Sequence, residues 1–210
     1  SASFYYEHAG ELNRELKAAI PADTLKALHK KRPFYHFVIA ARQFVLIIGL
    51  PIFIFHVQSF WLWFPASVLL GFVVFSFSVL LHESIHGLIF DRDRWGLSTP
   101  LGFVYGLLSG LSYAQFRRWH LDHHNNLGSE HLDPKRAYLS PKINAFWYKL
   151  LYCTPALIFI YARAVAKTLK DYPSSFRRRI GLERAVGIPF QLAVLAWFWT
   201  LDPAFALKAH

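Results

Sequence analysis

The chain has 210 residues, of which 54% are hydrophobic and 18% aromatic, and its mean hydropathy is positive at +0.26. This composition is more apolar than that of an ordinary soluble domain, and the length allows one domain. The net charge of +10 is compatible with nucleic-acid binding, but the long apolar segments favour a cationic surface that faces anionic lipid headgroups. Composition therefore predicts an integral membrane protein and argues against a nucleic-acid partner.

Residues 1–34 form a polar segment that contains leucines at helical spacing and ends near the basic run Lys30-Lys31-Arg32. A stripe of this kind is typical of an amphipathic helix that lies in the headgroup region, although a soluble helical arm has the same pattern. We expect an interfacial N-terminal segment over residues 1–34 and a membrane domain over residues 35–210.

Two apolar stretches follow, at residues 37–57 and 60–81. Each has about 20 residues, roughly the length that crosses a bilayer. Because the connection between them is short, they are expected to form a hairpin. Both flanks of the hairpin are rich in lysine and arginine, whereas the connection around residues 56–59 contains neither. The positive-inside rule then predicts that both flanks are cytoplasmic, and we expect a bacterial inner membrane.

Three further apolar stretches lie toward the C-terminus. Residues 100–114 carry glycines four apart, which allow close helix packing, and residues 147–166 are interrupted by charge and proline. Both suit interfacial or re-entrant helices better than full spans. Residues 186–201 predict one more crossing. The predicted fold is an all-α membrane protein, with a transmembrane hairpin, at least one further span, and cytoplasmic and interfacial helices that carry two clusters of histidines.

The two clusters combine His82 with His86, and His120 with His123 and His124. Spacings of three and four residues place imidazoles on one face of a helix. An isolated pair at this spacing is usually exposed or hydrogen-bonded. Five such histidines, predicted on one membrane side, instead indicate a metal centre, because imidazole is a common ligand of iron, zinc and copper.

The segments HESIHG (82–87) and RWHLDHHNN (118–126) resemble the HxxxH and HxxHH boxes of the membrane fatty acid desaturases, and residues 127–141 are similar to bacterial members. The resemblance covers roughly residues 35–200. A third HxxHH box is absent from the sequence. We therefore expect either that the protein continues beyond His210 and supplies further ligands, or that the chain has lost the complete site.

The resemblance implies a di-iron centre, which zinc could replace, with His82, His86, His120, His123 and His124 as ligands and no other catalytic residue. It also implies membrane lipids and a fatty acyl chain as substrate, O2 as oxidant, and a soluble ferredoxin-like or cytochrome-like electron donor.

Several polar neighbours of the boxes have two interpretations. Glu83 and Asp122 either accept hydrogen bonds from ligand imidazoles or are solvated carboxylates. Asn126 either caps its helix or holds a water near the metal. His131 follows the second box closely and is more readily interpreted as a loop residue than as a ligand.

Two rival functions share the same sequence features. The first is a carotenoid or alkane oxygenase of the same superfamily, which inserts oxygen where a desaturase removes hydrogen. The second is a catalytically inactive, desaturase-derived structural subunit of a larger membrane complex. Product analysis separates the enzymes from each other, and iron content separates both from the structural subunit.

Overall fold

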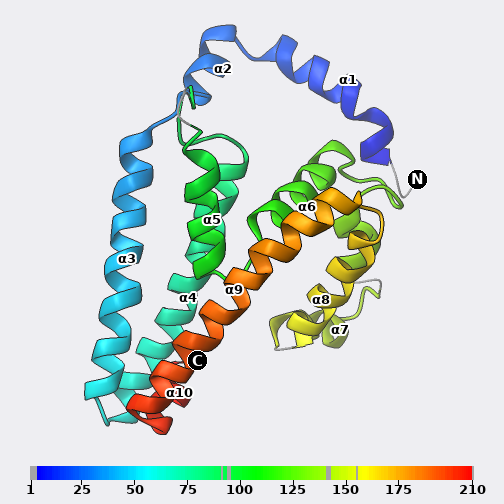
Figure 1. Cartoon of the computed structure of the whole chain (residues 1–210). Coiled ribbons are helices and arrows are strands. Elements are labelled where there is room, and N and C mark those ends of the chain that lie inside the picture. Colours follow the sequence, from blue (N-terminus) through cyan, green and yellow to red (C-terminus); the bar gives the residue numbers. More distant parts are fainter. Residues whose placement is uncertain (1–3, 91, 94–95, 141–142, 155, 210) are drawn as a thin grey trace. The chain divides into compact units, whose positions relative to one another are not determined.

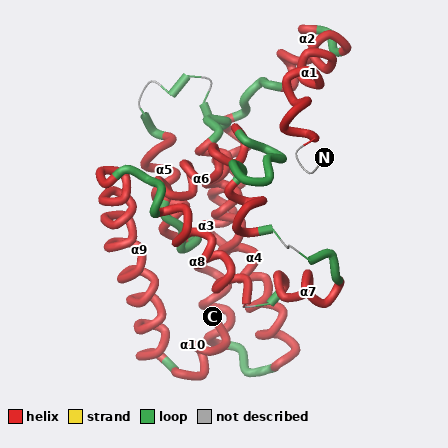
Figure 2. The backbone as a smooth tube through the Cα atoms, turned by 90° about the vertical axis from the view of Figure 1, so that its right-hand side faces the viewer, coloured by secondary structure: helices red, strands yellow, loops and turns green. Residues whose placement is uncertain are grey.

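A computed structural model of the protein describes residues 4–90, 92–93, 96–140, 143–154 and 156–209. Throughout these residues the regular elements are helices, and no strand occurs among them (Figure 2). Three helices are long and apolar enough to cross a membrane: α3 (Pro33–His56), α4 (Phe60–Ile85) and α9 (Ser174–Leu201). The predicted all-α class, the hairpin and the further span are confirmed.

The remaining elements are short. They are α1 (Phe4–Ala19), α2 (Ala22–Leu28), α5 (Ser98–Leu108), α6 (Tyr113–Asn125), the π-helix η1 (Lys135–Leu139), α7 (Phe146–Leu150), the 3-10 helix η2 (Leu151–Cys153), α8 (Ala156–Leu169) and α10 (Pro203–Ala209). Helices α5 and α8, of 11 and 14 residues, are shorter than the roughly 20 residues that a crossing needs. This agrees with the prediction that neither apolar stretch is a full span.

The chain divides into two compact units. We call residues 30–115 and 180–210 the hairpin unit, and residues 1–29 and 116–179 the second-box unit. Helices α6 and α9 begin in one unit and continue into the other.

In the hairpin unit, α3 and α4 run side by side, α5 packs on α4, and the short α10 contacts both long helices near their connecting turn (Figure 1). The buried cluster at that end comprises Ile54, Ala66, Leu70, Phe198, Phe205 and Ala206. The outer face of α3 is apolar as well, with Val45 exposed by 70% and Ile48 by 62%. An apolar exposed face of this kind suits contact with lipid, where packing and not water exclusion holds helices together.

Glycines allow the close packing of α5, as their spacing predicted. A β-carbon at Gly102 would lie 2.6 Å from the hydroxyl of Ser84 in α4. A β-carbon at Gly106 would lie 2.6 Å from the backbone carbonyl oxygen of Leu111. The Ser84 hydroxyl in turn donates a hydrogen bond to the carbonyl of Ser98 at 2.6 Å. Helices α4 and α5 are therefore joined by a close contact that leaves no room for larger side chains.

The second-box unit contains α1, α2, most of α6, η1, α7, η2 and α8. Trp119 of α6 makes an edge contact with Tyr161 of α8, at 6.5 Å between ring centroids. None of the residues of α1 is buried. The side chain of Tyr5 in α1 lies close to Gly128, in the loop after α6. The interfacial placement of residues 1–34 stays a prediction.

Candidate metal centre

The first histidine box lies where α4 ends. His82 is in the last turn and His86 is the residue that caps the helix. The helix stops because Gly87 adopts a positive φ of 62°, a conformation that glycine accepts without strain. The amide of Gly87 bonds the carbonyl of Ser84, and the amide of Leu88 bonds the carbonyl of Glu83, which is the Schellman pattern. The sequence HESIHG thus folds so that both imidazoles stand at one helix end.

Within that helix end the two imidazoles are close. The ring centroids of His82 and His86 are 4.6 Å apart, and each ring offers a nitrogen within 4.8 Å of one on the other. Both side chains are partly exposed. The pair can therefore act as two donors to one cation or to neighbouring cations.

Glu83, which lies between these histidines in sequence, is held from the first span. Its Oε2 lies 2.6 Å from Nδ1 of His36 in α3, and Nε2 of His36 lies 3.0 Å from the hydroxyl of Tyr105 in α5. His36 is 5% exposed and Tyr105 1% exposed. A phenol that donates to Nε2 and an Nδ1–H that donates to the carboxylate satisfy all three groups.

The environment of Tyr105 supports the role of its hydroxyl as the donor to Nε2 of His36. Burial, reinforced by the negative charge of Glu83, raises the pKa of Tyr105 to about 12, so the phenol keeps its proton. No role was predicted for His36, because a single histidine at the start of an apolar segment has no periodic partner. The signal that would have identified it is its burial, which depends on the packing of three helices.

The second box lies on α6, in the second-box unit. Nε2 of His120 and Nε2 of His124 are 2.9 Å apart, and their ring centroids are 4.5 Å apart. Phe116, one turn earlier, stacks on His120 at 5.5 Å between centroids. At this separation one neutral ring can donate its Nε2–H to the other, and both nitrogens are close enough to bind one cation when neither carries a hydrogen.

His123 has a different environment. Its Nδ1 lies 2.7 Å from Oδ1 of Asp133, a carboxylate in the loop after α6. Its ring is stacked with that of Trp119 at 6.4 Å between centroids. The rings of His123 and His124 are 5.5 Å apart between centroids, but within this box the hydrogen bond between ring nitrogens joins His120 and His124.

The polar neighbours named from the sequence contact other groups. Asp122 forms an i,i+4 ion pair with Arg118 at 3.0 Å. The amide side chain of Asn126 donates to the carbonyl of Asp122 at 2.9 Å, as expected of a residue that caps the helix end. The carboxylate that contacts a histidine of this box is Asp133, which was not among the residues predicted from the sequence. The Asp-Pro pair at 133–134, ten residues after His123, was the available signal, since it is typical of a turn residue that caps a helix.

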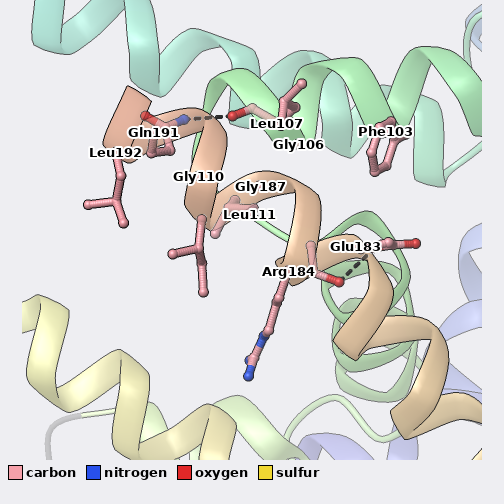
Figure 3. Close-up of a pocket in the computed structure, with 12 residues that line it drawn as sticks. Phe103, Gly106, Leu107, Gly110, Leu111, Glu183, Arg184, Gly187, Gln191 and Leu192 are labelled. Atoms are coloured by element: carbon pink, nitrogen blue, oxygen red, sulfur yellow. Dashed lines mark hydrogen bonds between the residues drawn. The ribbon is translucent and has the colours of Figure 1, made fainter. Parts of the chain in front are cut away.

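The hairpin unit also contains a cavity of about 170 Å³ between α5 and α9 (Figure 3). Its wall includes Gly106, Gly110 and Gly187, and Gln191 crosses it to donate to the carbonyl of Leu107 at 2.6 Å. Ligand pockets are usually about 300 Å³ or larger. The cavity is too small for a whole lipid chain.

Comparison with known proteins identifies the family. The family model "Fatty acid desaturase" matches residues 58–208, which include both histidine boxes. The chain belongs to the fatty acid desaturase family. It is an integral membrane protein of this family, with several apolar helices of spanning length.

Individual relatives are sphingolipid delta(4)-desaturase/C4-monooxygenases. The human protein is 29% identical over 155 residues, which cover 71% of this chain and 46% of the relative. The bovine protein is 27% identical over 205 residues, which cover 93% of this chain and 59% of the relative. The chain thus spans about half the length of the curated relatives that it matches. No solved structure matches it.

Proposed function

We propose that the protein is a membrane lipid desaturase whose histidine boxes hold iron. The observation that supports this proposal best is the pairing of imidazoles at the ends of helices, with Nε2 atoms of His120 and His124 only 2.9 Å apart, in a chain of this family. The assignment of both boxes to one centre follows from the family resemblance.

The chemistry of the donor set fits iron. Neutral imidazole is a good ligand for iron and for zinc, and each box contributes a pair of nitrogens close enough to serve one site. His82, His86, His120 and His124 would bind directly, with His123 as a fifth ligand. Bound iron, together with O2, supplies the oxidising power that removes hydrogen from an unactivated C–H bond, which no side chain provides.

The chain itself supplies orientation around these ligands. Gly87 ends α4 at the first box, and His36 fixes Glu83, so that the helix end is held from two neighbouring helices. Phe116 stacks on His120 and restricts the rotation of that ring. Fixed ligands bind a metal with a smaller entropic cost than mobile ones.

The substrate that we propose is a lipid acyl or sphingoid chain, because the relatives are named for sphingolipids. Their names combine a desaturase with a monooxygenase activity, so hydroxylation of the same chain is the second candidate reaction. An electron donor of ferredoxin or cytochrome type is required in both cases. We propose that it docks on the cytoplasmic side, where the histidine boxes are predicted to lie.

Iron content tests the proposal first. The protein is purified in detergent, loaded anaerobically with Fe(II), desalted and analysed by mass spectrometry for metal. We expect the wild-type protein to retain iron, with a marked loss in the double variants His82→Ala/His86→Ala and His120→Ala/His124→Ala. The matched control is His56→Ala, which removes an exposed histidine at the C-terminal end of α3, outside both boxes.

A second measurement identifies the reaction. The iron-loaded protein is incubated with a ceramide-type lipid, a reductant with ferredoxin or cytochrome, and O2. Loss of two hydrogens from the lipid would establish a desaturase, and gain of one oxygen a monooxygenase. A chain that binds no iron under these conditions would refute both and favour the structural-subunit alternative.

A further inference from the structure

The middle histidine of the second box has a buried carboxylate as its partner. His123 Nδ1 lies 2.7 Å from Asp133 Oδ1, and the side chains are exposed by only 13% and 3%. His120 and His124 are paired with each other instead. The three histidines therefore differ in their hydrogen-bond partners, because His123 bonds a carboxylate whereas His120 and His124 bond each other.

Asp133 receives only donors. Its Oδ1 accepts the backbone amides of Lys135 at 2.9 Å and Arg136 at 3.2 Å, and its Oδ2 accepts the amide of Gly128 at 3.4 Å. Because Oδ1 already accepts two backbone N–H groups, it presents a lone pair and not a hydrogen to the imidazole. The hydrogen between Asp133 and His123 must then belong to Nδ1 of the imidazole.

This assignment fixes the tautomer of His123. When Nδ1 carries the proton, Nε2 presents a lone pair, which is the form that a metal binds. The ring is also fixed in direction, because the buried indole of Trp119 stacks on its face and Asp133 bonds its Nδ1. Since both the tautomer and the direction are set before any metal arrives, His123 is prepared to act as a ligand through Nε2.

We propose that Asp133 is a positioning residue that presents Nε2 of His123 to the metal, an inference that rests on the proposed function. The carboxylate within the box itself, Asp122, does not serve this purpose, because it pairs with Arg118 on the exposed side of α6. The two aspartates thus form a natural comparison. Both lie near the second box, and only Asp133 touches an imidazole of it.

The test compares Asp133→Asn with the matched control Asp122→Asn. Co(II) is titrated into the metal-free protein in detergent, and its absorption reports affinity without any need for activity. Outer partners of ligand histidines typically contribute about 10–100-fold in metal affinity, so Asp133→Asn should weaken binding by about that factor and Asp122→Asn should leave it near wild type. Equal affinities in the two variants would overturn the inference.

A double-mutant cycle separates positioning from support of the loop. In a His123→Ala background, Asp133→Asn should cause no further loss of affinity, because the ring that it orients has gone. An equally large loss in both backgrounds would show that Asp133 only maintains the loop, and would overturn the proposal. A wild-type protein that binds no metal would refute the proposed function itself.

A measurement on the wild-type protein does not depend on any variant folding. The ring nitrogens of ¹⁵N-labelled, metal-free protein are assigned by NMR. We expect His123 to carry its proton on Nδ1, with the hydrogen-bonded proton shifted strongly downfield. A proton on Nε2 with a bare Nδ1 would contradict the contact with Asp133.

Discussion

Replacing His36 with leucine should destabilise the protein more than any other substitution of a histidine outside the two boxes. Leucine has a similar volume and suits an apolar helix, so the change removes hydrogen bonds with little loss of packing. It leaves the Oε2 of Glu83 and the hydroxyl of Tyr105 without the partners that lie at 2.6 and 3.0 Å.

The magnitude follows from the burial of the three groups. A hydrogen bond to a charged group contributes roughly 1.5–3 kcal/mol, and the lower end applies because the side chain of Glu83 is 35% exposed and water can replace its partner. The neutral bond to fully buried Tyr105 adds about 1 kcal/mol. The loss of about 2.5 kcal/mol corresponds to a fall in melting temperature of roughly 5–10 °C for a chain of this size.

The assay is thermal unfolding in detergent, followed by tryptophan fluorescence. His56→Leu is the control, since it makes the same substitution at an exposed position of the same helix. Tyr105→Phe should produce only the smaller part of the effect. If His36→Leu and His56→Leu have the same melting temperature, the His36 contacts do not stabilise the hairpin unit and the prediction is refuted.

Three other substitutions test the packing and the electrostatics. Gly106→Ala should lower the melting temperature, because the added carbon would lie 2.6 Å from the carbonyl oxygen of Leu111. Gly71→Ala adds a carbon in open space and should leave the melting temperature unchanged. Equal melting temperatures for the two variants would contradict this packing. Glu183→Ala should lower the free energy of unfolding, measured with denaturant, by about 1–2 kcal/mol, because the Glu183 carboxylate accepts the backbone amide of Ala114 at the start of α6 at 2.9 Å. An unchanged free energy would refute this cap. Burial, followed by the charge of Asp122, raises the pKa of Tyr172 from 10.0 to about 12, so the folded state favours the neutral phenol. The contribution of this phenol to the free energy of unfolding is complete below pH 10 and is lost as the pH rises through 12. Tyr172→Phe should therefore lose less stability than wild type between these pH values, and parallel pH profiles would count against the shift.

Local patterns accounted for much of the fold. The lengths of the apolar runs predicted α3, α4 and α9, because the thickness of a bilayer sets the length of a span. The α9 helix nevertheless begins at Ser174, twelve residues before the predicted crossing at 186. Its first turns carry Arg177, Arg178 and Arg179, which hydropathy excludes from a span but which a helix accommodates readily.

The sequence by itself determined the two histidine pairs, because residues four apart on a helix are neighbours whatever surrounds that helix. His82 meets His86 and His120 meets His124 for this reason alone.

Only the tertiary structure decided which carboxylates touch which imidazoles. Glu83 and Asp122 both lie inside the boxes, yet Glu83 bonds His36, 47 residues away, and Asp122 bonds Arg118. Asp133 reaches His123 because the chain turns back after α6 and buries that carboxylate among backbone amides. Such contacts depend on the direction of each side chain and on how close two segments approach, and neither quantity is contained in the spacing of residues along one helix.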